Sequence, residues 1–166
     1  MKMDNLQKQK NTITEKHLLQ TELRKPIILV TYDQPVQIKK SVKVRTYDLK
    51  VDKDKMISKV DVLFAFAFEE YGTIKESVRL NKDIESQKHK PIPKPADRPF
   101  VASQQEYKAG TGSKVRITMR NGTVLTGLQV HATKYNLILN IADKHVLVYK
   151  HGILQYQIQT TKKVKE

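Results

Sequence analysis

Residues 115–158 alternate apolar and polar side chains at a period of two, and this pattern constrains the fold more than any other feature. The period is typical of strands with one buried face, because successive side chains point to opposite sides of a sheet. Asn121-Gly122 predicts a tight hairpin turn, since both residues tolerate a positive φ. Gly127 falls in mid-strand, where a glycine usually marks a bend or bulge. Five short strands in some 44 residues predict a small, strongly bent barrel.

Several groups of residues follow one another in a set order along this stretch: Asn121-Gly122, Gly127, Tyr135-Asn136-Leu137 and Val148-Tyr149-Lys150-His151-Gly152-Ile153. The first three groups resemble the first motif of Sm-like proteins. The Tyr-Lys-His run, followed by a small residue and Ile, resembles the second motif in its bacterial Hfq form. The resemblance implies an Hfq-like Sm domain over residues 113–160.

An earlier stretch repeats the pattern in weaker form. Shifted forward by 88 residues, 27–51 lies over 115–139 without a gap, and the matched pairs are Val36 and Val124, Val42 and Val130, Tyr47 and Tyr135, Asp48 and Asn136, and Leu49 and Leu137. These are the positions that the strand pattern needs, so we expect an internal repeat. The alternative is chance, because any two alternating segments can be slid into register.

A short helix is expected before the first copy. Thr12 and Glu15 have the spacing of a capping box, in which a hydroxyl and a carboxylate each satisfy a free backbone amide. Leu18, Leu19 and Leu23 then share one helical face, and Pro26 ends the helix. Hfq also begins with a helix that caps its barrel, so the first copy resembles a divergent Sm-like domain.

The expected fold is mainly β, with two small five-stranded Sm-like barrels and an N-terminal α-helix capping the first. The expected boundaries are a divergent domain over 12–78, a Pro- and Lys-rich linker over 79–112, the second domain over 113–160 and a basic tail over 161–166. A short helix is predicted within 100–108. In the first copy, 52–59 is predicted as a charged loop, 60–68 as the strand preceding the Tyr-Lys-His position, and 73–78 as the closing strand.

The composition favours a binding protein with a polyanionic partner. The net charge is +14, which points to nucleic acid ahead of a membrane surface or an acidic protein. The alternative is that the excess charge lies in solvated tails. Cysteine is absent, and no catalytic motif, metal-ligand spacing or cofactor motif is present, so we expect no enzyme, metal or cofactor. No apolar run could span a membrane, and the charged N-terminus favours a cytoplasmic protein.

The resemblance implies where RNA would bind. Tyr135 would be the platform on which bases stack, with Lys134 beside it. Lys150 would reach a base or phosphate, and His151 would bond to phosphate or ribose. Tyr149 belongs to the same run, either as a contact or as a structural residue. The alternative is that Tyr135 is a rim aromatic and that Lys150-His151 is a solvated turn.

The first copy is expected to bind less well. Tyr47 keeps the aromatic platform, but Glu69 and Glu70 are expected at the positions of Lys150 and His151 and would repel phosphate. We therefore expect working pockets in the second copy alone. Arg24-Lys25 partly matches the basic rim of Hfq. Thr118 replaces the aromatic residue that binds adenine-rich RNA on the other face of Hfq, so such binding is not expected.

The resemblance as a whole implies an Sm/Hfq-like RNA chaperone or post-transcriptional regulator that binds uridine-rich single-stranded RNA in ring pockets. Three copies would form a pseudo-hexameric ring, because each chain carries two barrels. One alternative is an Sm-like ring that serves as a scaffold for protein partners. The other is a basic small-barrel protein that binds DNA without sequence preference.

Overall fold

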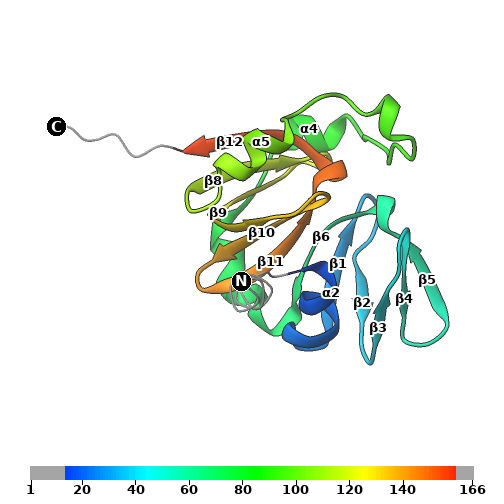
Figure 1. The fold of residues 1–166 in the computed structure, drawn as a ribbon. Coiled ribbons are helices and arrows are strands. Elements are labelled where there is room, and N and C mark those ends of the chain that lie inside the picture. Colours follow the sequence, from blue (N-terminus) through cyan, green and yellow to red (C-terminus); the bar gives the residue numbers. More distant parts are fainter. Residues whose placement is uncertain (1–13, 160–166) are drawn as a thin grey trace, which may run out of the picture.

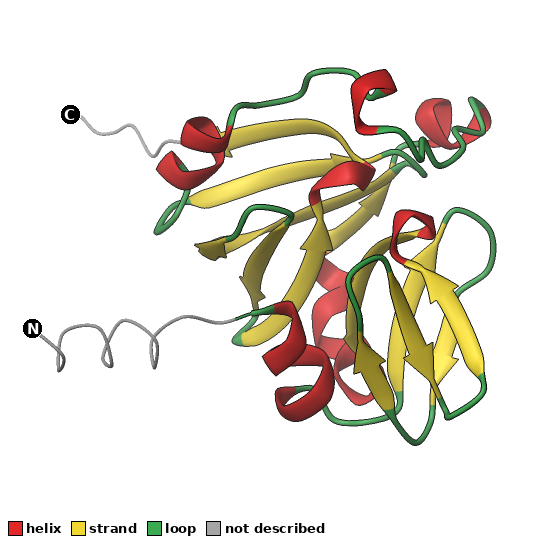
Figure 2. Ribbon diagram, turned by 45° about the vertical axis from the view of Figure 1, so that its right-hand side comes forward, coloured by secondary structure: helices red, strands yellow, loops and turns green. Residues whose placement is uncertain are grey.

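The structure is a computed structural model that describes residues 14–159, and its regular structure is mainly antiparallel strands (Figure 1). Nine strands form one sheet in the order β12-β8-β9-β10-β11-β6-β1-β2, with β7 paired to β9. A second sheet has the order β3-β4-β5. Figure 2 shows the two groups of strands with the short helices around them. The prediction of a mainly β protein is confirmed.

Five strands of the second half follow the alternating stretch: β8 (Lys114–Met119), β9 (Thr123–Ala132), β10 (Asn136–Ile141), β11 (Lys144–Tyr149) and β12 (Ile153–Gln159). They pair in the order β12-β8-β9-β10-β11, and η6 (Lys150–Gly152) joins the last two strands. Gly122 has a φ of +96° at the predicted hairpin turn between β8 and β9. The first and last strands of this unit therefore lie side by side.

Strand β9 bends at Gly127, as the glycine predicted. Before the bend β9 pairs with β8, and after it β9 pairs with β10. A Cβ atom on Gly127 would lie 2.7 Å from Ile141 Cγ1 and 2.9 Å from the carbonyl oxygen of Asn140. Glycine is therefore required here because the neighbouring backbone leaves no room for a side chain.

The first half has six strands in a related arrangement: β1 (Ile27–Thr31), β2 (Val36–Ile38), β3 (Val42–Val44), β4 (Asp48–Val51), β5 (Lys55–Ser58) and β6 (Val62–Ala67). Strands β2 and β3 occupy the place of the single bent strand β9. Between them, the carboxylate of Asp52 accepts hydrogen bonds from the backbone amides of Lys39, Lys40 and Ser41. These bonds lower the pKa of Asp52 and hold the chain at a sharp break where the second half has Gly127.

The loop after the bent strand is hydrogen-bonded identically in both halves. The amide of Arg45 donates to the Asp48 carbonyl, as that of Thr133 does to Asn136. The Lys59 amide donates to the Tyr47 carbonyl, as the Lys150 amide does to Tyr135. The offset between the halves is thus 88 residues up to the third strand and 91 residues after it, because the β10–β11 hairpin is longer than the β4–β5 hairpin.

This longer hairpin overturns part of the expected alignment. The fourth strand of the first half is β5, within the predicted charged loop, and the closing strand is β6, which pairs with β1 as β12 pairs with β8. Residues 73–78 were predicted as the closing strand, but they lie in α3 (Tyr71–Ile74) and η4 (Lys75–Ser77) and reach only the first residue of β7. The residues at the Tyr-Lys-His position are 58–60, in β5 and η2 (Lys59–Asp61), and not 68–70, which begin η3 (Phe68–Glu70).

The two halves form one continuous sheet because β11 pairs with β6. Leu147 lies opposite Ala65, and Val148 lies opposite Phe64. Each half also contributes side chains to the core of the other. Tyr149 packs into the core of the first half, and Phe64 packs into that of the second.

A helix begins the described chain as predicted, although its first residue differs. Thr14 caps α2 (Glu15–His17), and its hydroxyl accepts from the His17 amide, whereas Thr12 lies outside the described residues. A π-helical turn, η1 (Leu18–Glu22), follows and ends before Pro26. The predicted apolar face is buried against the first half, as Leu18, Leu19 and Leu23 belong to its core.

The segment predicted as a linker contains several short elements of regular structure. It contains β7 (Val78–Leu80), α4 (Lys82–Ser86), η5 (Pro95–Asp97) and α5 (Gln104–Ala109). Strand β7 extends the edge of β9, so the expected boundary at residue 78 cuts through an element of the second half. The predicted helix is found as α5, and its capping box joins Ser103 and Glu106. The expected basic tail lies outside the described residues.

No helix in the described part is long and apolar enough to cross a membrane. Among the same residues, no group of three or more His, Cys, Asp or Glu side chains could hold a metal ion.

We predict that Gly127→Ala lowers the free energy of unfolding by roughly 1–3 kcal/mol, since the added methyl group meets backbone at 2.9 Å. The matched control is Gly72→Ala in α3, where a Cβ atom would meet nothing within 4 Å and alanine favours helix. Urea unfolding of both variants checks the prediction. Equal stability of the two variants would contradict the close approach at the bend.

Candidate nucleic-acid interface

A cavity of about 390 Å³ opens between the end of β9, η6, α5 and the segment before α5. It brings together four of the predicted RNA-binding residues, Lys134, Tyr135, Lys150 and His151. Four cationic side chains border it and no carboxylate does: the described lining is Ile92, Pro95, Arg98, Pro99, Phe100, Val101, Ala102, Gln104, Tyr107, Arg120, Lys134, Tyr135, Lys150, His151 and Ile153. We call this cavity the basic cavity.

Tyr135 presents its ring at the mouth of the basic cavity with 66% of its surface exposed. Its backbone is held firmly, because its carbonyl accepts from the Lys150 amide at 2.9 Å and the flanking residues Thr133 and Asn136 bond to each other. The Lys134 ammonium lies 5.3 Å from the ring centroid, within range of a cation–π contact. An exposed aromatic ring on a rigid loop is suited to stacking with a planar ligand.

Lys150 lies deeper in the basic cavity and has neutral partners. Its Nζ donates to Gln104 Oε1 at 2.7 Å and to the Thr133 carbonyl at 2.6 Å. It also lies 4.5 Å from the centroid of the Tyr107 ring. Burial, with a smaller contribution from Lys108, lowers the pKa of Lys150 to about 8. Lys150 is therefore mostly charged at pH 7, and no carboxylate neutralises it.

His151 is turned toward the first half. Its Nε2 lies 2.8 Å from the Val62 carbonyl, so this nitrogen must carry the proton of the neutral ring. Burial lowers the pKa of His151 to about 4, which keeps the ring neutral at pH 7. The remaining Nδ1 can only accept. In this conformation the implied bond from His151 to a phosphate is not available, although a ribose hydroxyl could donate to Nδ1.

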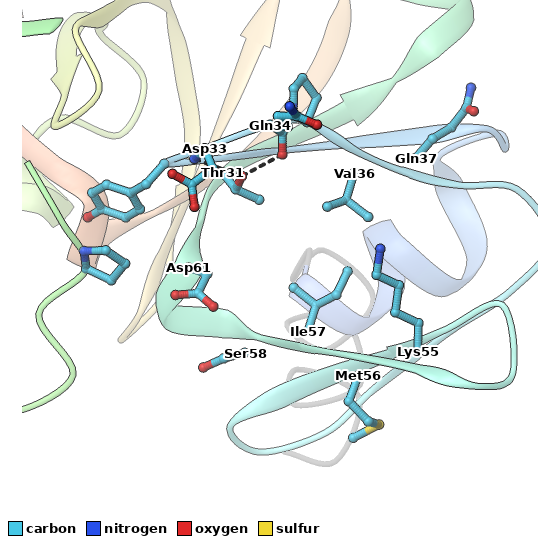
Figure 3. A pocket seen from close by; sticks show the side chains of 13 residues that line it. Thr31, Asp33, Gln34, Val36, Gln37, Lys55, Met56, Ile57, Ser58 and Asp61 are labelled. Carbon is cyan, nitrogen blue, oxygen red and sulfur yellow. Dashed lines mark hydrogen bonds between the residues drawn. The ribbon is translucent and has the colours of Figure 1, made fainter. Parts of the chain in front are cut away.

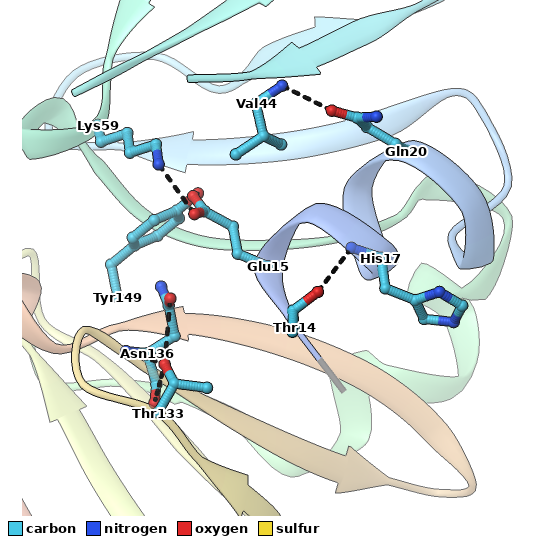
Figure 4. A network of polar contacts seen from close by, with 9 residues as sticks. All are labelled: Thr14, Glu15, His17, Gln20, Val44, Lys59, Thr133, Asn136 and Tyr149. Atoms are coloured by element: carbon cyan, nitrogen blue, oxygen red, sulfur yellow. Dashed lines mark hydrogen bonds and ion pairs between the residues drawn. The ribbon is translucent and has the colours of Figure 1, made fainter. Parts of the chain in front are cut away.

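Tyr149 is a structural residue and not a surface contact, which corrects its place among the predicted RNA-binding residues. The ring is fully buried between the halves, and its hydroxyl donates to Glu15 Oε2 at 2.5 Å (Figure 4). Burial and the neighbouring Glu15 carboxylate raise the pKa of Tyr149 well above its usual value. Glu15 also accepts from Lys59 Nζ at 2.9 Å, so the three side chains tie the halves together.

The first half repeats the frame of this site with different electrostatics. Tyr47 is 82% exposed at the position of Tyr135, and Lys59 stands at the position of Lys150. Each lysine meets the first residue of a capped helix, which is Gln104 in α5 but Glu15 in α2. In the first half Lys59 therefore forms an ion pair with Glu15, whereas in the second half the charged Lys150 has only a neutral partner, Gln104.

The remaining predicted residues lie outside the basic cavity. The expected alignment placed Glu69 and Glu70 beside a binding loop, which is wrong. They instead approach Arg24 and Lys144, at 3.9 and 3.6 Å respectively. Arg24 is largely exposed, and neither it nor Lys25 lines the basic cavity.

A larger cavity of about 660 Å³ lies in the first half, between the β1–β2 turn and β5 (Figure 3). Asp33 and Asp61 stand at one end of it, and Lys55 lies at the other. Met56 and Ile57 line it from β5. The carboxylates make this cavity less suited to a polyanion than the basic cavity.

Sequence reasoning missed the residues that complete the basic cavity from the segment before α5 and from α5 itself. Arg98, Phe100, Gln104 and Tyr107 all come from the part predicted as a linker. The capping box at Ser103 and Glu106 was a signal for α5 in the sequence. Nothing in the alternation pattern indicated that the preceding segment would lie beside Tyr135.

No family model matches this chain. A solved structure described as the "1.55 A Crystal structure of the pleiotropic translational regulator, Hfq" is similar to part of it, with 31% sequence identity. The match covers 33% of this chain and 90% of that chain, with a TM-score of 0.29.

We predict that affinity for single-stranded RNA falls by about 2- to 10-fold between about pH 7 and pH 9, because Lys150 loses its proton and with it roughly 0.5–1.5 kcal/mol of binding. Titrations at constant ionic strength measure this effect. In Lys150→Arg the guanidinium stays charged, so its affinity should decline less. Identical pH profiles for the two proteins would show that Lys150 does not contact the RNA.

Proposed function

We propose that this protein binds single-stranded, uridine-rich RNA in the basic cavity and acts as an RNA chaperone or post-transcriptional regulator, without being an enzyme. The observation that carries the proposal is the exposed ring of Tyr135, on a loop fixed by backbone hydrogen bonds, beside four cations and no carboxylate. Unpaired bases stack on aromatic rings while cations meet the backbone phosphates. The preference for uridine rests on the resemblance of the Tyr-Lys-His run to Hfq.

The proposal includes two Sm-like barrels in tandem. The equivalent strand orders support it, and so do the matching hydrogen bonds of the loops at Tyr47 and Tyr135. The first barrel is the divergent copy, since its bent strand is broken at Asp52.

The chain is proposed to assemble as a ring of three copies. Within one chain, the fourth strand of the second half pairs with the closing strand of the first. The other two strands of these kinds are the fourth strand of the first half, β5, and the closing strand of the second half, β12. Each of them has a partner on one side only. Pairing them between copies would continue the same sheet, with Met56 opposite Tyr156 in the register of Leu147 and Ala65. Such pairing would also remove two exposed sheet edges.

Only the second half of each chain is proposed to bind RNA. At the junction within the chain, Glu15 neutralises Lys59, and the buried Tyr149 donates a hydrogen bond to Glu15. At a junction between copies, β5 of one chain would lie beside β12 and the basic cavity of the next chain. The residue of β5 equivalent to Tyr149 is Ser58, and its small side chain would leave that cavity open. A ring of three chains would thus carry three binding sites.

We predict that Tyr135→Ala weakens binding of a labelled uridine-rich strand by about 5- to 150-fold, the loss expected for one stacked base at 1–3 kcal/mol. Tyr47→Ala is the matched control, because it removes an exposed tyrosine from the equivalent loop and should leave affinity unchanged. Fluorescence anisotropy titrations measure both.

Two outcomes would contradict the RNA proposal. Equal, weak and salt-sensitive binding by both variants and by the unaltered protein would indicate nonspecific polyanion binding. No RNA binding at all would favour the scaffold for protein partners. Adenine-rich and double-stranded DNA probes in the same titration separate base preference from charge.

We predict a mass three times that of the 19.2 kDa chain in light scattering. The chain has no cysteine, so a disulfide can be introduced at a chosen position. Lys55 and Gln157 are both exposed, and in the proposed register they lie opposite each other, next to the pair Met56 and Tyr156. The variant that combines Lys55→Cys and Gln157→Cys should form disulfide-linked dimers and trimers on oxidation. Each single variant alone should form no trimer. A monomeric mass at concentrations that bind RNA would exclude the ring.

A further inference from the structure

Phe100 is the most exposed of the large apolar side chains bordering the basic cavity, with 79% of its surface accessible. Its neighbours are anchored, because Val101 and Ala102 pack against the core of the second half. An exposed phenylalanine beside two packed residues gains nothing from folding, since burial of apolar surface is what stabilises such a side chain. Its exposure at the cavity leaves the ring free to contact a ligand.

The segment that carries Phe100 is held in a defined shape. Arg98 Nε donates to the Ile92 carbonyl at 2.8 Å, and its Nη2 donates to that of Pro93 at 3.0 Å. Pro99 restricts the backbone immediately before Phe100. On the other side, the Ser103 capping box begins α5. The backbone is thus fixed by hydrogen bonds on both sides of Phe100.

The supports of Phe100 and Tyr135 are joined to each other. Gln104 Nε2 donates to the Lys134 carbonyl at 3.1 Å, and Gln104 Oε1 accepts from Lys150. One amide therefore links the helix that follows Phe100 to the loop that precedes Tyr135. Two exposed aromatic rings on linked supports border one cavity, with Lys134 and Arg98 among its cations.

We propose that Phe100 is a second base-stacking platform, so that the basic cavity binds two unpaired nucleotides of one strand, the first on Tyr135 and the second on Phe100. The proposal rests on the proposed RNA-binding function and names the length of strand that the site takes. Stacking does not depend on base identity, because every base has an aromatic face. The phosphate that joins the two nucleotides would lie near Lys134 and Arg98.

The test compares ligand lengths by calorimetry, with uridine monophosphate, diuridine and hexauridine as probes and the full chain as the protein. We expect Phe100→Ala to weaken diuridine and hexauridine binding by about 5- to 150-fold and to leave uridine monophosphate binding unchanged. Tyr135→Ala should weaken all three. Phe68→Ala is the matched control, as it removes another exposed phenylalanine outside the cavity and should change none.

Phe100→Leu separates stacking from packing, because leucine keeps apolar bulk without a ring. We expect it to lose as much affinity as Phe100→Ala, and Phe100→Tyr to retain it. Normal hexauridine binding by Phe100→Ala, with the loss confined to Tyr135→Ala, would overturn the second platform and leave the RNA-binding function standing. No binding by the unaltered protein would overturn both. A change in the mass of the assembly formed by Phe100→Ala, with unchanged RNA affinity, would show that the phenyl group contacts another copy of the chain. That result would overturn the proposal.

Discussion

The pairing of β11 with β6 is the interaction on which the rest of the structure depends. It consists of backbone hydrogen bonds between the two halves, and it brings Leu147 and Val148 against Ala65 and Phe64. Because the strands are joined, Tyr149 enters the core of the first half while Phe64 enters the core of the second. Loss of the pairing would therefore remove a large aromatic side chain from each core. The same contact places His151 against Val62 and thereby sets its neutral state.

The two halves share a frame and differ in charge. In both, a lysine amide bonds to the carbonyl of an exposed tyrosine, and the lysine ammonium reaches the first residue of a capped helix. The difference between Glu15 and Gln104 decides whether that ammonium is neutralised. A carboxylate makes a closed ion pair with Lys59, whereas an amide holds Lys150 in place and leaves its charge available. Such a change supports the proposal that the first half stabilises the fold while the second binds a polyanion.

Sequence reasoning located the strands of the second half, the turn at Asn121-Gly122 and the bend at Gly127. Its alignment of the first half with the second agrees, up to Leu49, with the matching hydrogen bonds of the loops at Tyr47 and Tyr135. It failed after that point in the first half. The aromatic-rich run from Val60 to Phe68 has the clearest alternation, and it was therefore read as the fourth strand, whereas the actual β5 is short and charged. Alternation shows that a segment is a strand, but it does not show which neighbour the strand pairs with.

The sequence by itself determined the local elements, because the two-residue period, the turn glycines and the capping residues act within a few positions of the chain. It also determined which residue types could meet a polyanion, including Tyr135 and Lys150. Only the tertiary structure decided which of them are exposed: it buried Tyr149, turned His151 inward and brought Phe100 and Gln104 to the basic cavity. These outcomes depend on contacts between residues far apart in the chain, and such contacts leave no periodic pattern to read.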